Sequence, residues 1–338
     1  MKAIVLSRYG GPEVLELIDV DAPVPGPDDI LVDVHHSALN RADVLQRMGL
    51  YPDPRRPAVE IPGLEYAGVV AATGGRVTER AVGDEVMGIE SGGCHAEQLV
   101  TNARQALPVP DGIAMVDAAA IPEVFMTAWD ALVVQGGLTS GRWALVHAGA
   151  SGVGTAAIQL AKAIGAHIAV TCSSGKADAC RALGADIVLE RSPADWATAL
   201  STALGEHGRT DGIDVILDVI GGDEANRNLA AVRRQGRIVQ VGLMGGGRTE
   251  VDLGLLLTKR VRWTGTVLRS RPLEEKVALS RRFAEEVVPL FAGGALRPVI
   301  DRRFALSDVA AAHERMEADA NVGKLLLDVR SLGKPVRT

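Results

Sequence analysis

Short runs of hydrophobic residues, separated by turn residues, make up the first part of the chain. Glycine and proline clusters, such as Gly10-Gly11-Pro12 and the proline-rich stretch 52–62, interrupt these runs. Runs of this length, bounded by turn signals, are typical of strands. We expect strands over residues 3–6, 15–20, 30–38 and 66–72. The pattern predicts a small, mostly β domain over residues 1–122.

The pattern changes from about residue 143. Apolar runs now alternate with segments in which hydrophobic residues recur at the period of a helix. We expect strands over 143–147, 167–172, 187–189, 213–217, 237–241 and 261–267. We expect helices over 152–164, 176–183, 196–204 and 224–232. Strands that alternate with crossover helices predict an α/β fold with a doubly wound parallel sheet.

The last part of the chain returns to a mixed pattern. It predicts a helix over 273–291, a β segment over 299–304, a helix over 307–317 and a final strand over 324–329. A terminal strand of this kind could return to the first domain.

Composition and charge narrow the class of protein. The 338 residues carry 36 basic and 42 acidic side chains, and the formal net charge of -6 opposes nucleic-acid binding as the main role. No apolar run approaches the ~18 residues of a membrane-spanning helix. The three cysteines show no CxxC spacing, which is typical of a reducing compartment. A soluble, cytoplasmic protein is expected.

A glycine-rich turn joins the first strand of the predicted parallel sheet to the helix that follows. Its sequence is HAGASGVG, residues 147–154. Gly149 favours a tight turn, Gly152 lets a pyrophosphate approach the backbone, and Gly154 lets helix and strand pack closely. Ser151 stands where the dinucleotide-binding fingerprint usually has its second glycine, so its hydroxyl could contact phosphate. A purely structural loop is the alternative, which the regular units downstream disfavour.

The end of the second strand of this sheet bears on the choice of cofactor. NAD-binding folds usually place an acidic residue there, ~20 residues beyond the glycine turn, to hold the ribose 2′-hydroxyl. Here Ser173, Ser174 and Lys176 occupy the place, and Arg191 follows the third strand. Hydroxyl and cationic groups suit a 2′-phosphate, so NADPH is the expected cofactor. The alternative is that Lys176 and Arg191 are ordinary solvated charges.

Several short motifs, in order along nearly the whole chain, carry a resemblance to a known family. They are ALNRAD (38–43), PGLE (62–65), AIPE (120–123), the glycine turn, LDVIGG (217–222), GLMGG (242–246), LRSR (268–271) and NVGK (321–324). The chain resembles the zinc-independent, zeta-crystallin-like quinone oxidoreductases of the medium-chain dehydrogenase/reductase superfamily, particularly the subgroup of the p53-induced quinone oxidoreductase. The resemblance implies a GroES-like, mostly β catalytic domain built from residues 1–122 and 268–338. It also implies a Rossmann NADPH-binding domain at 123–267, with the active site in the cleft between the domains.

The resemblance further implies a metal-free site. Zinc alcohol dehydrogenases of this superfamily hold their catalytic metal with a Cys, a His and a second Cys or an acid, and the corresponding positions here are Asn40, Leu64 and Glu123. One carboxylate cannot assemble a three-ligand zinc site. A quinone or activated enone is already electrophilic and needs mainly a positioned hydride, whereas alcohol oxidation needs stabilisation of an alkoxide. The implied direction is reduction by NADPH.

By the family pattern, Asn40, Asp43 and Tyr51 are the candidate catalytic residues at the nicotinamide and substrate end. The Tyr51 phenol could stack on a ring or donate to a developing oxyanion, or it could simply pack in its proline-rich loop. Asn40 and Asp43 have the i, i+3 spacing of a helix cap, so capping of a helix over 42–48 is an equally strong alternative.

The family pattern also assigns contacts to the cofactor. Thr127 resembles a contact near the ribose and phosphates, and the main chain around 242–244 and 268 would embrace the nicotinamide. The complete set of candidate cofactor residues is Thr127, Gly149, Ser151, Gly152, Val153, Gly154, Ser173, Ser174, Lys176, Arg191, Gly242, Leu243, Met244 and Leu268.

Together these observations favour an NADPH-dependent reductase that passes hydride to a quinone or a similar activated enone. An enoyl-thioester reductase is the nearest alternative, because the same metal-free superfamily uses the same hydride geometry. A non-enzymatic NADPH-binding protein, like the lens crystallin relatives, is an alternative of a different class. The family expectation for assembly is a homodimer formed through the edge of the Rossmann sheet. Neither a membrane nor a nucleic acid is an expected partner.

Overall fold

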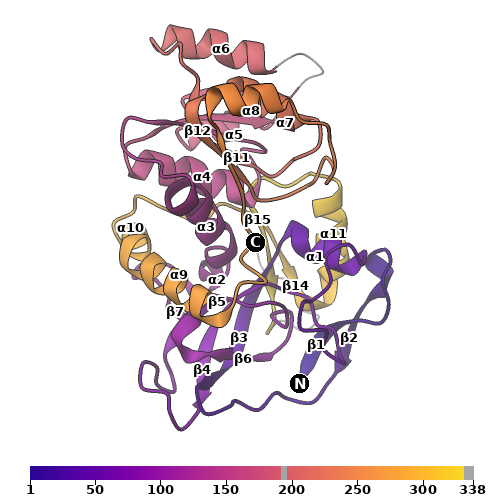
Figure 1. The fold of residues 1–338 in the computed structure, drawn as a ribbon. Coiled ribbons are helices and arrows are strands. Elements are labelled where there is room, and N and C mark those ends of the chain that lie inside the picture. The colour runs from indigo at the N-terminus through magenta and orange to yellow at the C-terminus, as the bar shows by residue number, and fades with distance from the viewer. Residues whose placement is uncertain (192–195, 331–338) are drawn as a thin grey trace. The chain divides into compact units, whose positions relative to one another are not determined.

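The computed structural model describes residues 1–191 and 196–330, and the chain divides into two compact units (Figure 1). Unit 1 comprises Met1–Met126 and Leu268–Thr338, and unit 2 comprises Thr127–Val267. The end of the predicted segment 268–338 lies outside the described residues.

Unit 1 contains most of the strands expected near the chain ends. Its strands are β1 (Lys2–Leu6), β2 (Leu15–Asp19), β3 (Asp29–Leu39), β4 (Glu65–Thr73), β5 (Glu85–Ile89), β6 (Gln98–Asn102), β7 (Leu107–Pro108), β14 (Ile300–Ala305) and β15 (Lys324–Asp328). Its helices are α1 (Arg41–Arg47), α2 (Met115–Ala118), α9 (Leu273–Glu286), α10 (Val288–Ala292) and α11 (Val309–Glu317), and α3 (Pro122–Trp129) begins in it. Short 3-10 turns lie at Pro12–Val14, Ala103–Gln105 and Leu306–Asp308.

The long strand β3 organises the main sheet of unit 1. The strand order is β14-β15-β3-β4-β5-β7, and β6 also pairs with β3. The first half of β3 pairs with β6 and its end pairs antiparallel with β15, where Leu326 lies opposite Ala38. The terminal strand therefore returns to the N-terminal part of the chain, as the sequence predicted.

Unit 2 contains the alternating strands and helices. Its strands are β8 (Trp143–Val146), β9 (His167–Cys172), β10 (Ile187–Glu190), β11 (Ile213–Asp218), β12 (Val232–Gln240) and β13 (Arg262–Gly265). Its helices are α4 (Gly152–Ala163), α5 (Ala177–Ala182), α6 (Trp196–Glu206), α7 (Glu224–Ala231) and α8 (Leu253–Lys259), and a π-helical turn covers Asp130–Gln135.

The strands of unit 2 form one parallel sheet in the order β10-β9-β8-β11-β12-β13. The chain winds outward in one direction from β8 to β10 and in the other from β11 to β13. This order confirms the predicted α/β class and the doubly wound Rossmann sheet. The point where the direction reverses lies between β8 and β11, at whose carboxyl ends such sheets bind ligands.

Aliphatic side chains build most of the core of each unit, since only 3% of the residues are aromatic. In unit 2, Leu145, Ile216 and Ile238 of neighbouring strands are fully buried with Trp196 of α6. In unit 1, the core between the sheet and α11 includes residues of β3, β4 and β15. The rigid sheets supply the platforms from which the functional loops extend.

One predicted helix is divided in the structure. The sequence predicted a single helix over 273–291, but α9 ends at Glu286 and α10 starts at Val288. Pro289 has no N–H to donate to the carbonyl four residues earlier, so the α9 ladder cannot continue through it. The sequence reading also missed α8, which Asp252 caps by accepting from the Leu255 N–H at 2.9 Å.

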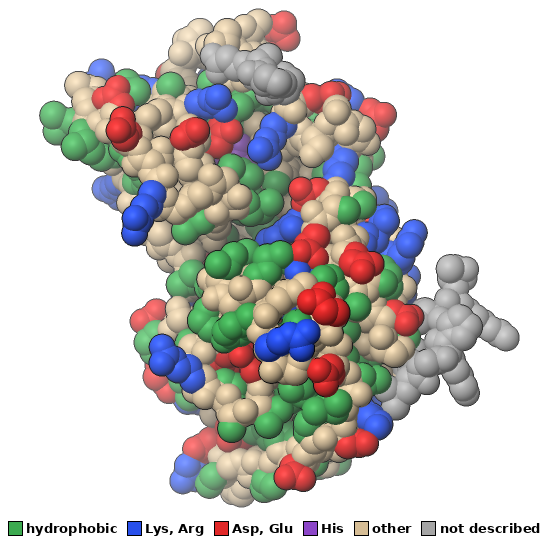
Figure 2. Space-filling model, turned by 90° about the vertical axis from the view of Figure 1, so that its right-hand side faces the viewer, with side chains coloured by type: hydrophobic (Ala, Val, Ile, Leu, Met, Phe, Trp, Pro, Cys, Tyr) green, Lys and Arg blue, Asp and Glu red, His purple; other side chains and the backbone are tan. Residues whose placement is uncertain are grey.

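The face of the molecule shown in Figure 2 carries charges of both signs. On the face shown in Figure 2, Lys and Arg side chains are interspersed with Asp and Glu side chains. No helix among the described residues is long and apolar enough to cross a membrane.

Candidate functional site

The glycine turn of unit 2 begins where strand β8 ends. Ala148 adopts the left-handed backbone conformation, with a φ of 57°. Gly149 is the second residue of the turn that the Ser151 N–H closes on the Ala148 carbonyl at 2.9 Å, as the sequence predicted. It also lies against β9, where an added Cβ would be 2.6 Å from Val170 Cβ. A Cβ on Gly154 would lie 2.3 Å from the Ala148 carbonyl oxygen. Close packing of the turn, rather than an unusual φ, therefore requires both glycines.

Helix α4 starts directly after this turn, with Ser151 as its N-cap. The Ser151 hydroxyl oxygen accepts a hydrogen bond from the Gly154 N–H at 3.0 Å. Within the described part of the chain, no protein group accepts from the N–H groups of Gly152 and Val153. These amides, at the positive end of the helix, are available to an anion, and the Ser151 hydroxyl can still donate its own proton. The turn has the geometry of a pyrophosphate cradle.

The residues predicted to bind a 2′-phosphate come from the ends of two neighbouring strands. The ends of β9 and β10 are paired, and the Arg191 N–H donates to the Cys172 carbonyl at 2.6 Å. Ser173 and Ser174 follow directly and are exposed, and Lys176 precedes the first residue of α5. The structure therefore brings both hydroxyls and both basic residues to one edge of the sheet.

The third predicted cofactor segment follows strand β12. The side chain of Gln240 donates to the Gly242 carbonyl at 2.7 Å, and a Cβ on Gly242 would lie 2.9 Å from the Val219 carbonyl oxygen. The main chain is thus held in place, while the Leu243 and Met244 side chains are exposed. An exposed apolar pair beside a fixed backbone is suited to contact a flat, apolar ring.

Two further candidate cofactor residues lie where the chain passes from one unit to the other. Thr127, on α3, is the first residue of unit 2 and is 8% exposed. Leu268 is the first residue of the second segment of unit 1 and is buried.

A buried polar network that sequence reasoning missed supports the loops of unit 2. His147, the first residue of the glycine turn, contacts Thr171 Oγ1 at 2.9 Å and Asn228 Oδ1 at 2.8 Å. The Asn228 amide donates to Asp218 Oδ2 at 3.0 Å, and Asp218 Oδ1 accepts from two main-chain N–H groups of the following loop. The network joins the carboxyl ends of β8, β9 and β11 to α7. Its sequence signal was the presence of polar residues at the ends of apolar strands.

In unit 1 the candidate catalytic residue Asp43 caps helix α1. Its Oδ2 accepts from the Asn40 N–H at 2.7 Å, and its Oδ1 accepts from the Gly63 N–H at 3.0 Å. The side chain is fully buried, and burial raises the pKa of Asp43 to about 6, against the effect of the two N–H groups. The capping alternative is confirmed for this pair.

Asn40 belongs to a second buried group, centred on an ion pair. Lys324 Nζ on β15 lies 2.6 Å from Glu65 Oε1 on β4, and both side chains are almost fully buried. Lys324 also donates to Asn40 Oδ1 at 2.6 Å, and Asn40 Nδ2 donates to Glu65 Oε1 at 2.9 Å. The second oxygen, Glu65 Oε2, accepts from the Glu123 N–H at 2.9 Å. Sequence reasoning quoted Glu65 and Lys324 within family motifs but did not foresee their pairing.

These contacts test whether the residues at the family's catalytic zinc positions could hold a metal here. The Asn40 amide is engaged by Lys324 and Glu65, and Leu64 is apolar. Of the three positions, only Glu123 brings a carboxylate. Among the described residues, no three His, Cys, Asp or Glu side chains are placed to hold a metal ion. The residues present therefore do not fit a catalytic zinc site.

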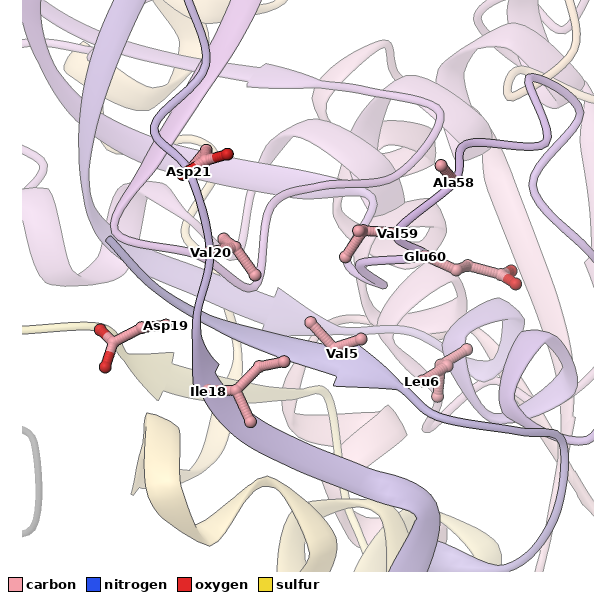
Figure 3. A pocket seen from close by; sticks show the side chains of 9 residues that line it. All are labelled: Val5, Leu6, Ile18, Asp19, Val20, Asp21, Ala58, Val59 and Glu60. Atoms are coloured by element: carbon pink, nitrogen blue, oxygen red, sulfur yellow. The ribbon is translucent and has the colours of Figure 1, made fainter.

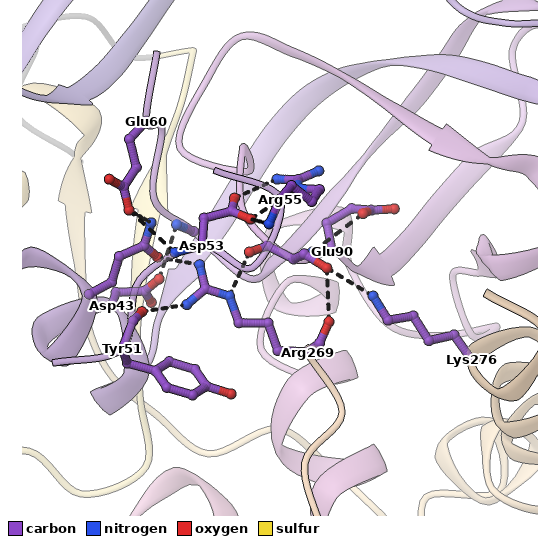
Figure 4. A network of polar contacts seen from close by, with 11 residues as sticks. Asp43, Tyr51, Asp53, Arg55, Glu60, Glu90, Arg269 and Lys276 are labelled. Carbon is purple, nitrogen blue, oxygen red and sulfur yellow. Dashed lines mark hydrogen bonds and ion pairs between the residues drawn. The ribbon is translucent and has the colours of Figure 1, made fainter. Parts of the chain in front are cut away.

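Arg269 is a site residue that the sequence analysis named only as part of the LRSR motif. Its side chain is 6% exposed, and its guanidinium donates to the Ser91 carbonyl at 2.6 Å and to Gln46 Oε1 at 2.7 Å. It also donates to the Tyr51 carbonyl at 2.8 Å and lies 5.0 Å from the centre of the Tyr51 ring (Figure 4). Arg269 thus holds both the main chain and the ring of Tyr51.

The Tyr51 phenol keeps its proton at neutral pH. Burial raises the pKa of Tyr51, the charge of Glu123 raises it further, and Arg269 opposes both. In Figure 4 the hydroxyl end of the ring points away from the guanidinium. Tyr51 can therefore donate a hydrogen bond to a group outside this network.

A separate hollow of about 520 Å³ lies beside the first two strands of unit 1 (Figure 3). It is lined by Val5, Leu6, Ile18, Asp19, Val20, Asp21, Ala58, Val59 and Glu60. None of the predicted site residues is among them. Its acidic side chains disfavour a phosphate-bearing ligand, so we do not assign it to the cofactor.

Comparison with known families supports both halves of the predicted architecture. Residues 26–111 match the alcohol dehydrogenase GroES-like domain, which confirms the expected nature of the β domain. Residues 152–285 match the zinc-binding dehydrogenase family. The GroES-like domain and the Rossmann sheet together make the α/β fold of the medium-chain dehydrogenases and reductases.

Individual relatives are similar to this chain over nearly its whole length. The quinone oxidoreductase of Pseudomonas aeruginosa is 34% identical over 96% of this chain and 99% of its own length. A spectinabilin polyketide synthase system protein of Streptomyces orinoci is 33% identical over 97% of this chain, which spans only 14% of that protein. The crystal structure of Escherichia coli quinone oxidoreductase complexed with NADPH matches with a TM-score of 0.87 and 28% identity, covering 97% of this chain and 100% of that one.

Proposed function

We propose, from the premise that the chain belongs to the medium-chain dehydrogenase/reductase superfamily as a quinone oxidoreductase-like oxidoreductase, that it is a metal-free, NADPH-dependent reductase of quinones or similar activated enones. The observation that carries the proposal is the buried Lys324–Glu65 pair. It engages Asn40, at a position where the zinc enzymes need a metal ligand. Within the group, the ordered set of motifs from ALNRAD to NVGK resembles the subgroup of the p53-induced quinone oxidoreductase.

NADPH fits the residues of unit 2, and when bound it supplies the hydride for the reduction. The free N–H groups of Gly152 and Val153, with Ser151, would hold the pyrophosphate. Ser173, Ser174, Lys176 and Arg191 would hold the 2′-phosphate. The exposed pair Leu243 and Met244 and the backbone at Gly242 would pack on the nicotinamide, and Thr127 completes the set in unit 2. Leu268, in unit 1, stays a predicted contact. The NADPH complex of the Escherichia coli relative supports this choice of cofactor.

On the acceptor side, Tyr51 is the group that we assign to the substrate. Its phenol is neutral, so it can donate a hydrogen bond to a carbonyl oxygen that becomes negative as hydride arrives. Asn40 and Asp43 have their polar atoms engaged within unit 1. We therefore assign them to holding α1 and the Tyr51 loop in place.

For assembly we propose a homodimer formed through strand β13, which lies at one edge of the Rossmann sheet while β10 lies at the other. Residues of β13 are largely exposed, which leaves a strand edge for a second copy. The mixed surface charges and the net charge of -6 give no support for a nucleic-acid partner.

Steady-state consumption of NADPH with an ortho-quinone tests the proposed activity. Turnover is expected with the quinone; confirmed NADPH binding without turnover of any acceptor would instead favour a non-enzymatic NADPH-binding protein. Activity on enoyl thioesters but not on quinones would favour the enoyl-thioester reductase.

The cofactor assignment has its own test in Lys176→Ala. Loss of one charge-assisted bond to the 2′-phosphate should raise the KM for NADPH about tenfold or more and leave the KM for NADH nearly unchanged. Arg227→Ala, which removes an exposed cation on α7, serves as the control and should change neither. Equal effects of Lys176→Ala on both cofactors would remove the 2′-phosphate assignment.

A further inference from the structure

The carboxyl groups of Asp43, Glu65 and Glu123 act on one another inside unit 1. In two of them, both carboxylate oxygens accept from a neighbouring N–H group. Asp43 accepts from two main-chain N–H groups. Glu65 accepts from the Lys324 ammonium and the Asn40 amide at one oxygen and from a main-chain N–H at the other. Both acids are fully enclosed, so neither can reach a bound substrate.

The third acid, Glu123, differs in position and in partners. It is the second residue of α3, and its main-chain N–H is the group that donates to Glu65 Oε2. Its side chain is only half-buried, and among the described residues none donates a hydrogen bond to its carboxyl group. Tyr51 lies near enough for the charge of Glu123 to act on its phenol. Glu123 is therefore the acid of this cluster that can meet a substrate held by Tyr51.

We propose that the Glu123 carboxyl group is the proton donor that completes the reduction of enones. The inference rests on the proposed function. Hydride adds with its electron pair to the β-carbon of the enone, the carbon–carbon π pair moves to form an enolate, and the α-carbon takes the proton from Glu123. Water then returns a proton to the carboxylate. In sum, one enone, one NADPH and one proton give a saturated ketone and NADP⁺.

The surroundings of Glu123 keep its proton in place at neutral pH. The charged and titratable groups that act on it or lie near it are Glu65 from β4, Asp43 from α1, Lys324 from β15, Arg269 from the segment after β13, and Tyr51. Burial raises the pKa of Glu123 to about 8, and Glu65 and Asp43 add to this while Lys324 and Arg269 oppose it. Because the Lys324 ammonium forms an ion pair with Glu65, its positive charge mainly offsets the negative charge of Glu65 rather than that of Glu123. A general acid works best when its pKa lies near the working pH.

Quinones provide the internal comparison. Reduction of a quinone places the new protons on oxygen, where exchange with water is fast. An alkyl enone must gain a proton on carbon, which is slow without a positioned acid. Loss of the Glu123 proton should therefore slow reduction of the enone and leave reduction of the quinone nearly unchanged.

The test compares Glu123→Gln with the unchanged enzyme on 3-buten-2-one and on 1,2-naphthoquinone, with NADPH, across pH 6 to 10. Glutamine keeps the shape and removes the proton. We expect kcat on the enone to fall about 100-fold or more, and kcat on the quinone to change little. The unchanged enzyme should lose enone activity as pH rises through about 8, and the variant should lack this step. Glu16→Gln, which removes an exposed acid on β2, is the matched control and should resemble the unchanged enzyme.

The outcomes separate this inference from the proposed function. If the unchanged enzyme reduces neither acceptor, the proposed function fails. If it reduces the quinone but not the enone, the inference fails and the quinone activity stands. An equal loss on both substrates, or an alkaline step that persists in Glu123→Gln, would show a structural role and overturn the inference.

Discussion

Both units bury a polar cluster beneath their candidate functional residues, and the two clusters differ in charge. In unit 2, Asp218 is provided with an amide and two main-chain N–H donors, and His147 and Asn228 extend the network between strand ends. In unit 1, Asp43, Glu65 and Glu123 share the region with Lys324 and Arg269. The first arrangement satisfies its acid completely and serves to hold loops. Among the described residues, the second leaves the Glu123 carboxyl group without a hydrogen-bond donor, so this group can keep a proton and transfer it.

The two clusters should also differ in how much their interactions contribute to the stability of the fold. Hydrogen bonds within a largely neutral network each add a modest net stability. A buried ion pair is costly to desolvate and severely destabilising when one partner is removed. We therefore expect changes in the unit 1 cluster to be larger, and to depend more on pH, than changes in the unit 2 network.

The largest effect should come from Lys324→Met. Methionine fills the space but leaves Glu65 as a buried carboxylate without its cation, so the free energy of unfolding should fall by ~3–5 kcal/mol. Denaturant unfolding measures this loss. Lys2→Met, which removes the exposed partner of Asp19, is the control and should change little. A double variant Lys324→Met/Glu65→Leu should recover part of the loss, and failure to recover any would argue that the lysine acts through something other than the pair.

The next effect concerns the pH dependence of stability. The pKa of Glu123 is about 8 in the folded chain and near its ordinary value of 4.5 when unfolded, so the folded state binds more protons between these values. Stability should therefore fall as pH rises through this window, by at most ~1.4 kcal/mol per pH unit for one group. Glu123→Gln should flatten the curve and be more stable than the unchanged protein at pH 9.

Thermal and denaturant unfolding at a series of pH values measure this difference. Glu16→Gln should give a curve parallel to that of the unchanged protein, because its carboxyl group is exposed. Parallel curves for Glu123→Gln as well would mean that Glu123 ionises normally in the folded state, and the comparison between the clusters would lose its main support.

The smallest of the three effects should follow Asn228→Ala in unit 2. This change removes the donor to Asp218 Oδ2 and the partner of His147, at a cost of ~1–3 kcal/mol in the free energy of unfolding. Asn226→Ala, an exposed position on the same helix, should cost less. A loss as large as that of Lys324→Met would show that the two networks do not differ as we infer.

Most of the fold could be predicted because its signals are local. The alternation of apolar strands and amphipathic helices between β8 and β13 follows from side-chain periodicity, and the helix α4 follows a recognisable glycine turn. Prediction failed where a local signal was weak or misread. Pro289 interrupts a pattern that otherwise suits one helix, and the short helix α8 was missed.

The candidate site could be predicted only in part. Ser151 and Lys176 were named because each lies within or close to a segment that is typical of dinucleotide binding. Arg269 was given no role beyond the LRSR motif, because a lone arginine in a sequence does not show whether it will be buried against Tyr51. The Asn40 and Asp43 pair was correctly recognised as a capping candidate, since that relation spans one turn of helix.

The sequence by itself determined the class of fold and the place of the glycine turn, because each depends on residue types at short spacings. Only the tertiary structure decided which acidic side chain pairs with Lys324. Glu65, Lys324 and Glu123 come from distant parts of the chain, and the pairing of β15 with β3 brings Lys324 to Glu65 rather than to Glu123. Which carboxyl group keeps its proton depends on that choice of partner and on burial, and neither can be read from the order of residues.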